Sequence, residues 1–250
     1  MKEADSEAGG PTQVQVVRLL HHRVHLGFAG PGNIDVWLGD ITQDPVELEQ
    51  LNSCLTPAER DRANAIRHPS ARAQALTGRA RLRELLGRHL HCLPQMVDIE
   101  TRPDGKPVLC GPHAGIRFNL SHTHDHWAAV IATVDVGIDL ELIRPMPGAV
   151  GLVQRYFHPS EAKQFHAIPE ELRIEAFFRG WTQKEAVLKG LGCGIRGLER
   201  IVVDLDPRRT PRILGDRELV SGWQVASVKP TPHAMLSVAV RTRTPLQFTA

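Results

Sequence analysis

The chain has 250 residues, of which 42% are hydrophobic and 23% are charged, a composition typical of globular proteins and far from that of disordered chains. Thirty Lys and Arg residues against 28 Asp and Glu residues leave a formal net charge of +2, which is too balanced for a protein that coats nucleic acid. The four cysteines lie far apart without a Cys-x-x-Cys pair, which argues against a zinc knuckle, a redox motif and a disulfide framework.

The predicted elements alternate between short strands and longer helices. Residues 1–13 are polar, so we expect a flexible leader and no signal peptide. A strand is predicted at 34–41, where apolar residues recur at every second position. Thr56, followed by Pro and by Glu59, predicts a helix start with a capping box, and a second helix is predicted at 71–90.

The second part of the chain has the same kinds of element. We expect a turn at 103–105, strands through Phe118 and Leu120, at 127–134 and at 136–143, and helices starting near Pro159 and spanning 170–191. No apolar run approaches the roughly 20 residues needed to cross a bilayer. We therefore expect a cytoplasmic protein with no membrane partner.

An internal repeat predicts the domain organisation. A single offset of 102 residues superimposes six similar pairs: Val36 and Ile138, Leu38 and Leu140, Pro57 and Pro159, Glu59 and Glu161, Leu76 and Phe178, Gly78 and Gly180. With a small shift, the segment 126–132 also resembles 233–239. We therefore predict an α+β fold of two similar halves, 14–135 and 136–250, related by a pseudo-two-fold axis with a cleft between them.

The string GIDLE at 137–141 places two carboxylates, Asp139 and Glu141, on one face of a predicted strand. Carboxylates this close repel each other unless water or a cation lies between them, and Mg²⁺ favours such oxygen ligands. Taken alone, the pair is better explained as two acids on a solvated strand face.

The string WTQKEAVLK at 181–189 places Lys184, Glu185 and Lys189 on one predicted helix. One interpretation is an exposed salt bridge between residues four apart. The other assigns Glu185 to a metal or a proton and both lysines to phosphate.

The string RFNLSHTHDH at 117–126 has three histidines at alternate positions, but its spacing departs from known zinc motifs. Ser121 lacks a Gly-x-Ser-x-Gly elbow, so a Ser121-His122 pair that contacts phosphate fits better than a serine hydrolase. The glycines at 192–197 match Gly-x-Gly-x-x-Gly, but they follow a helix, where a dinucleotide fingerprint follows a strand.

Taken in this order, the strings GKP (105–107), FNLSH (118–122), GIDLE (137–141) and WTQKEAVLK (181–189) resemble the Sfp-type 4′-phosphopantetheinyl transferases. The resemblance implies a monomer of two similar halves that moves phosphopantetheine from coenzyme A to a serine of an acyl or peptidyl carrier protein. It also implies dependence on Mg²⁺ and release of adenosine 3′,5′-bisphosphate.

The resemblance also implies roles for individual residues. Asp139, Glu141 and Glu185 match the metal ligands, and Glu185 matches the base that deprotonates the carrier serine. Lys184 and Lys189 match contacts to the pyrophosphate, and Lys189 could stabilise the leaving phosphate. The remaining matches concern the rest of coenzyme A: Ser121 and His122 for its phosphates, Lys106 and Pro107 for adenine, and Arg62 for the 3′-phosphate.

One departure from the family concerns Glu59, which stands where some relatives have a basic residue. Four arginines could share that role, and the sequence leaves their division open: Arg60, Arg62, Arg72 and Arg79. Two alternatives remain. One is another carboxylate-metal nucleotide phosphotransferase. The other is a non-enzymatic module that binds nucleic acid through the arginines of the helix predicted at 71–90, which we call the basic helix. The second would leave Asp139, Glu141 and Glu185 without a purpose. The pathway of the carrier protein also stays open.

Overall fold

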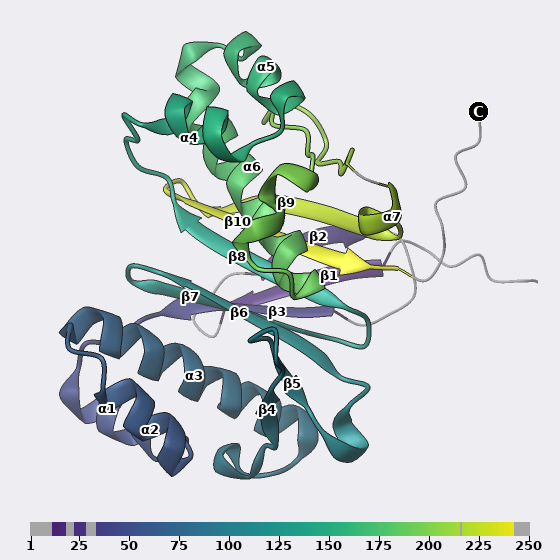
Figure 1. Ribbon diagram of the computed structural model, residues 1–250. Coiled ribbons are helices and arrows are strands. Elements are labelled where there is room, and N and C mark those ends of the chain that lie inside the picture. Colours follow the sequence, from purple (N-terminus) through teal and green to yellow (C-terminus); the bar gives the residue numbers. More distant parts are fainter. Residues whose placement is uncertain (1–11, 19–22, 29–33, 216, 243–250) are drawn as a thin grey trace, which may run out of the picture.

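A computed structural model describes residues 12–18, 23–28, 34–215 and 217–242 of the chain (Figure 1). Its strands are β1 (Thr12–Arg18), β2 (Arg23–Phe28), β3 (Ile34–Asp40), β4 (Ile99–Thr101), β5 (Pro107–Leu109), β6 (Arg117–Thr123), β7 (His126–Ala132), β8 (Val136–Leu142), β9 (Trp223–Thr231) and β10 (Ala234–Arg241). Its α-helices are α1 (Pro45–Asn52), α2 (Pro57–Asn64), α3 (Pro69–Leu90), α4 (Ala149–Tyr156), α5 (Pro159–Ala167), α6 (Glu170–Leu191) and α7 (Arg217–Val220). Short 3-10 helices lie at Pro94–Met96, Gly111–His113 and Ile195–Arg200.

Two β-sheets form the middle of the molecule, and helices cover their outer faces (Figure 1). The first sheet has the strand order β2-β1-β3-β7-β6, and the second, antiparallel sheet has the order β8-β10-β9. Helix α3 packs on β6 and β7, whereas α6 packs on β8, β9 and β10. Apolar side chains of both sheets join in one cluster, which includes Val36 and Val130 from the first and Ile138 and Val238 from the second. Strands β6 and β8 also lie against each other where the two sheets meet.

Local sequence signals explain where the helices begin and end. Thr56 and Glu59 form the predicted capping box at the start of α2, and His158 and Glu161 form another at the start of α5. The long helices α3 and α6 have 22 residues each. Helix α6 ends where Gly192 adopts a φ of 78°, a left-handed conformation that glycine reaches without strain.

A buried ion pair joins each of the short helices α2 and α5 to the long helix that follows it. Glu59 Oε2 lies 2.6 Å from Arg83 Nε, and Lys184 Nζ pairs with the carboxylate of Glu161. Each carboxylate also accepts the backbone N–H that precedes its own helix. The repeated ion pair is consistent with the internal repeat in the sequence, whereas the pseudo-two-fold axis stays a prediction.

The α+β class is confirmed, and the predicted helix at 170–191 has the bounds of α6. Helix α3 begins two residues before the predicted helix at 71–90. Of the predicted leader, residues 1–11 lie outside the described residues, and Thr12 and Gln13 belong to β1. Within the residues that the structure describes, no helix combines the length and the apolar character that a membrane span requires.

Candidate active site

Three predicted site residues from three different elements meet where the two sheets join. Lys189 on α6 places Nζ 2.6 Å from Oδ1 of Asp139 on β8 and 3.0 Å from Oγ of Ser121 on β6. These residues are far apart in the sequence, and the packing of α6 and β6 against β8 brings them together. A cation, a carboxylate and a hydroxyl therefore share one site, which we call the Lys189 cluster.

The Ser121 hydroxyl has a full set of hydrogen bonds within the protein. It donates to Asp139 Oδ1 at 3.0 Å and accepts from Lys189 Nζ and from the backbone N–H of Leu140. A hydroxyl has one hydrogen and two lone pairs, so no bonding capacity is left over. Ser121 thus orients Asp139 and Lys189 in this arrangement, and a contact with phosphate requires the exchange of one of these bonds.

Two further residues of β6 reach across to β8 and were missed in the sequence. Asn119 Oδ1 accepts the backbone N–H of Ile138 at 3.2 Å, and Thr123 Oγ1 donates to Glu141 Oε2 at 3.3 Å. Asn119, Ser121 and Thr123 alternate along β6, so their side chains leave the same face of the strand. That period of two was the signal that could have identified them.

Two buried carboxylate oxygens beside the cluster, Asp139 Oδ2 and Glu185 Oε1, have no hydrogen-bond partner among the described residues. Burial and the charge of Asp139 raise the pKa of Glu185, while the nearby Lys189 partly lowers it. The same two causes raise the pKa of Glu141, against the effect of Arg144. The three predicted metal ligands are therefore close enough for their negative charges to repel one another.

This donor set fits a hard divalent cation. Mg²⁺ typically uses one or two protein carboxylates and completes its shell with water and phosphate oxygens. In the arrangement shown by the described residues, no group of three or more His, Cys, Asp or Glu residues is placed to hold a metal. The unpartnered oxygens of Asp139 and Glu185 are nevertheless atoms whose burial a cation would compensate.

His122 follows Ser121 on β6, and its side chain leaves the opposite face of the strand, toward α3. A Cβ placed on Gly78 of α3 would lie 3.9 Å from its Cδ2 atom. Partial loss of hydration and the charge of Lys189 lower the pKa of the imidazole. The contact of His122 with a phosphate stays a prediction.

A cavity of about 510 Å³ gathers a second set of predicted residues between α2, α3 and the hairpin of β4 and β5. Arg62, Arg79 and Pro107 lie in its wall. Arg79 also pairs with Glu59 at 2.5 Å, and Arg72 donates to the carbonyl of Ile66. Of the arginines considered for the 3′-phosphate, Arg62 and Arg79 are thus the two that line this cavity.

Glu59 has a structural role that accounts for its departure from the family pattern. Its carboxylate is 5% exposed and bonds to Arg83, Arg79 and the backbone N–H of Thr56. Burial alone would raise its pKa, but these partners lower the pKa to about 2. Glu59 therefore holds the basic helix in place and does not substitute for a basic ligand.

Lys106 connects the turn before this cavity to the end of α6. Its Nζ donates to the carbonyl oxygen of Gly190 at 2.5 Å, and burial lowers its pKa. Its neighbour Pro107 lines the cavity. The predicted adenine-binding pair is therefore split: Pro107 faces the cavity, whereas the ammonium of Lys106 is bound to α6.

The position of Lys184 contradicts its predicted contact with pyrophosphate. The side chain is fully buried, donates to Glu161 and to the carbonyl of Ile201, and lies 4.7 Å from the centre of the Phe157 ring. Five residues separate it from Lys189, about 140° around an α-helix, so the two lysines point in different directions. Lys184 belongs to the core, and Lys189 to the site.

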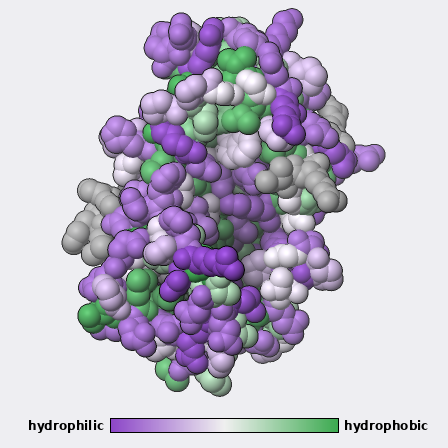
Figure 2. Space-filling model, turned by 60° about the vertical axis from the view of Figure 1, so that its left-hand side comes forward, coloured by the Kyte–Doolittle hydropathy of each residue, from purple (hydrophilic) through white to green (hydrophobic). Residues whose placement is uncertain are grey.

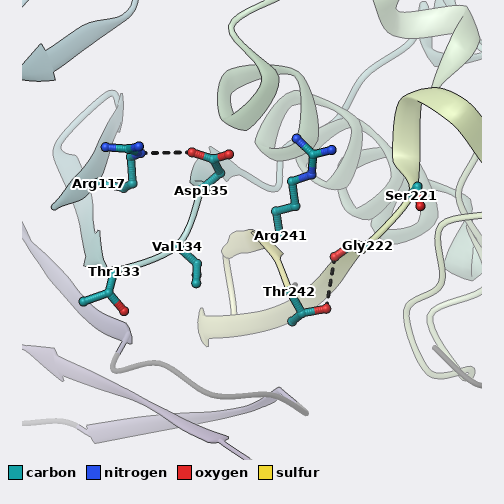
Figure 3. Close-up of a pocket in the computed structure, with 8 residues that line it drawn as sticks. All are labelled: Arg117, Thr133, Val134, Asp135, Ser221, Gly222, Arg241 and Thr242. Carbon is teal, nitrogen blue, oxygen red and sulfur yellow. Dashed lines mark hydrogen bonds and ion pairs between the residues drawn. The ribbon is translucent and has the colours of Figure 1, made fainter. Parts of the chain in front are cut away.

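One face of the molecule is hollowed and hydrophilic near its middle, as Figure 2 shows. A different cavity, of about 570 Å³, lies at the beginning of β6 and β8 and contains the ion pair of Arg117 and Asp135 (Figure 3). None of the predicted site residues is among the described residues that line this second cavity.

Comparisons with known proteins agree with this geometry. A model of the 4′-phosphopantetheinyl transferase superfamily matches residues 135–239, and a model of the N-terminal part of 4′-phosphopantetheinyl transferases matches residues 42–135. The chain is 34% identical to the 4′-phosphopantetheinyl transferase HetI of Nostoc, over 83% of this chain and 87% of HetI. It is 32% identical to the 4′-phosphopantetheinyl transferase AcpT of Escherichia coli K12, over 73% of this chain and 86% of AcpT. The chain therefore belongs to the 4′-phosphopantetheinyl transferase superfamily and is a transferase.

Proposed function

We propose that this protein transfers 4′-phosphopantetheine from coenzyme A to a serine of an acyl or peptidyl carrier protein and releases adenosine 3′,5′-bisphosphate. The observation that carries the proposal is the Lys189 cluster, in which a partly exposed lysine lies beside buried carboxylate oxygens that have no hydrogen-bond partner among the described residues. Family membership supplies the reaction class, and the cluster supplies groups of the right charge for a pyrophosphate.

Asp139, Glu141 and Glu185 would hold Mg²⁺, which when bound offsets the negative charge of the pyrophosphate. Two observations support this assignment. The pKa values of Glu141 and Glu185 are both raised, and Asp139 Oδ2 has no hydrogen-bond partner among the described residues. A divalent cation would compensate the mutual repulsion of these carboxylates more fully than their present partners, Lys189 and Arg144.

Glu185 would act as the base for the carrier serine. Its raised pKa makes this carboxylate a better acceptor for the proton of the serine hydroxyl. As the proton passes to Glu185, the serine oxygen bonds to the phosphorus nearer the pantetheine. The bond from that phosphorus to the bridging oxygen breaks, and its electron pair leaves with the adenosine bisphosphate.

Lys189 would stabilise the leaving group. Its side chain is 30% exposed, so Lys189 contacts Asp139 while it stays accessible to a ligand. A phosphate oxygen can replace Ser121 or Asp139 as an acceptor without leaving the cation unpaired. Lys189 thus carries the positive charge that compensates the leaving phosphate.

The remaining groups would bind the nucleotide end of coenzyme A. His122 beside the cluster suits the 3′-phosphate, and the cavity lined by Arg62, Arg79 and Pro107 suits the adenosine with its phosphate. We further propose that the enzyme works in the cytoplasm as a monomer and has no nucleic-acid partner. Two arginines of the basic helix, Arg79 and Arg83, are already paired with Glu59 inside the protein.

Intact-protein mass spectrometry of an apo carrier protein tests the proposal. After incubation with this protein, coenzyme A and Mg²⁺, the carrier should gain the mass of one phosphopantetheine, and a chelator should prevent the gain. The controls are Glu185→Gln and a carrier whose acceptor serine is replaced by Ala. Absence of transfer to both acyl and peptidyl carriers, together with absence of coenzyme A binding, would refute the proposal.

A further inference from the structure

A row of polar side chains crosses the three-stranded sheet beneath α6. In the strand register, Ser237 of β10 lies opposite Asp139 of β8 on one side and opposite Ser227 of β9 on the other. Residues that are directly opposite in a sheet project from the same face. Because Asp139 contacts Lys189 of α6, this is the face that α6 covers. Ser237 is fully buried there.

The hydroxyls of this row form a hydrogen-bonded chain with α6. Thr182 Oγ1 lies 2.7 Å from Ser237 Oγ, which lies 2.8 Å from Ser227 Oγ, and Gln183 Nε2 donates to Ser227 Oγ at 3.0 Å. Thr182 and Gln183 are both fully buried. The chain therefore ties two adjacent residues of α6 to β9 and β10.

The chain gives each of its hydroxyls polar neighbours on more than one side. Thr182 Oγ1 also lies 3.2 Å from the carbonyl oxygen of Arg179, and Ser237 Oγ lies between the hydroxyls of Thr182 and Ser227. A hydroxyl donates one hydrogen and can accept two, so each of these contacts can be a hydrogen bond. Removing the hydroxyl of Thr182 or Ser237 would therefore leave a buried neighbour without its partner.

Thr182 begins the stripe of α6 that carries the proposed catalytic groups. Thr182, Glu185 and Lys189 are spaced by three and four residues, so they lie on one side of the helix. One end of the stripe is bonded to Ser237 and the other end, at Lys189, is bonded to Asp139. Ser237 and Asp139 are themselves paired across two neighbouring strands.

We propose that Thr182 and Ser237 are positioning residues that set the rotation of α6 over the sheet, so that Glu185 and Lys189 face Asp139. Apolar packing is non-directional and tolerates small rotations of a helix. A hydrogen bond weakens steeply when its distance or angle changes. The buried hydrogen-bonded chain therefore fixes the orientation of α6 over the sheet. The catalytic importance of this orientation rests on the proposed function.

The test compares Thr182→Val and Ser237→Ala with a matched control, Thr77→Val. Thr77 is also a fully buried helical threonine, but its hydroxyl has no partner among the described residues, so its loss should leave activity unchanged. We expect Thr182→Val and Ser237→Ala to stay folded, to lower kcat roughly tenfold or more, and to weaken Mg²⁺-dependent binding of coenzyme A in calorimetry. Thr182→Ser, which keeps the hydroxyl, should restore both quantities.

Two results would overturn the proposal. One is a crystal structure of Thr182→Val in which Lys189 keeps its contact with Asp139. The other is a variant whose melting temperature falls while kcat for the folded fraction and coenzyme A affinity stay at the wild-type values, since this indicates a purely structural role. If the wild-type protein neither binds coenzyme A nor modifies a carrier, the proposed function fails, and the crystal comparison still decides whether Thr182 positions α6.

Discussion

Replacing Lys184 by Met should destabilise the protein without removing its affinity for coenzyme A. The variant removes the cation from a pair in which neither side chain is more than 1% exposed. Removing one partner of a buried ion pair costs about 3–5 kcal/mol. The carboxylate of Glu161 keeps two backbone N–H partners, at His158 and Val203, so we expect a cost near 3 kcal/mol. For a chain of this size that corresponds to a melting temperature lower by roughly 6–12 °C.

The assay combines thermal unfolding with calorimetry of coenzyme A binding well below the melting temperature. Lys189→Met is the matched control, because this lysine is 30% exposed and lies in the proposed site. It should lose less stability than Lys184→Met, because Lys189 is partly exposed, and it should bind coenzyme A poorly. Adding Glu161→Gln to Lys184→Met should recover part of the lost stability, since no uncompensated charge then remains. A Lys184→Met protein that unfolds at the wild-type temperature but fails to bind coenzyme A would refute the reasoning.

Three further predictions concern the site and its support. Glu185→Gln should abolish transfer, measured by the mass of the carrier, with unchanged circular dichroism; loss of the fold would make Glu185 structural. Asp139→Ala should weaken coenzyme A binding measured with Mg²⁺ far more than binding measured with a chelator, and equal losses would argue against Asp139 as a ligand. Because the pKa of Glu59 falls from about 4.5 to about 2 on folding, its carboxylate contributes about 3 kcal/mol above pH 4.5, and this contribution disappears as the pH falls toward 2. Glu59→Gln should flatten that part of the pH profile of urea unfolding, whereas an unchanged profile would show that Glu59 is not its source.

Helix ends and strand periodicity were readable in the sequence because they depend on neighbouring residues. The capping box of Thr56 and Glu59 and the glycine that ends α6 act within a few residues of themselves. Strands β1 and β2 were not predicted. Their pairing partners are each other and β3, so their stability depends on the sheet they join.

The two lysines of the string WTQKEAVLK show where sequence reasoning failed. Helix α6 packs against both the sheet and the helices α4 and α5, so it is buried on several sides and has no simple polar face. Lys184 and Lys189 therefore look equivalent in the sequence. The fold assigns Lys184 to Glu161 and Lys189 to Asp139, and these partners come from different elements.

By itself, the sequence indicated the family, through motifs that resemble it, and the α+β class, through local periodicity. The roles of Asp139, Glu141 and Glu185 as metal ligands stay predictions. Only the tertiary structure decided that the Ser121 hydroxyl bonds to Asp139, Lys189 and β8, and that Thr182 and Ser237 belong to a buried hydrogen-bonded chain under α6. The physical reason is that a hydrogen bond is defined by the distance and angle between two groups, and here those groups come from segments up to 68 residues apart.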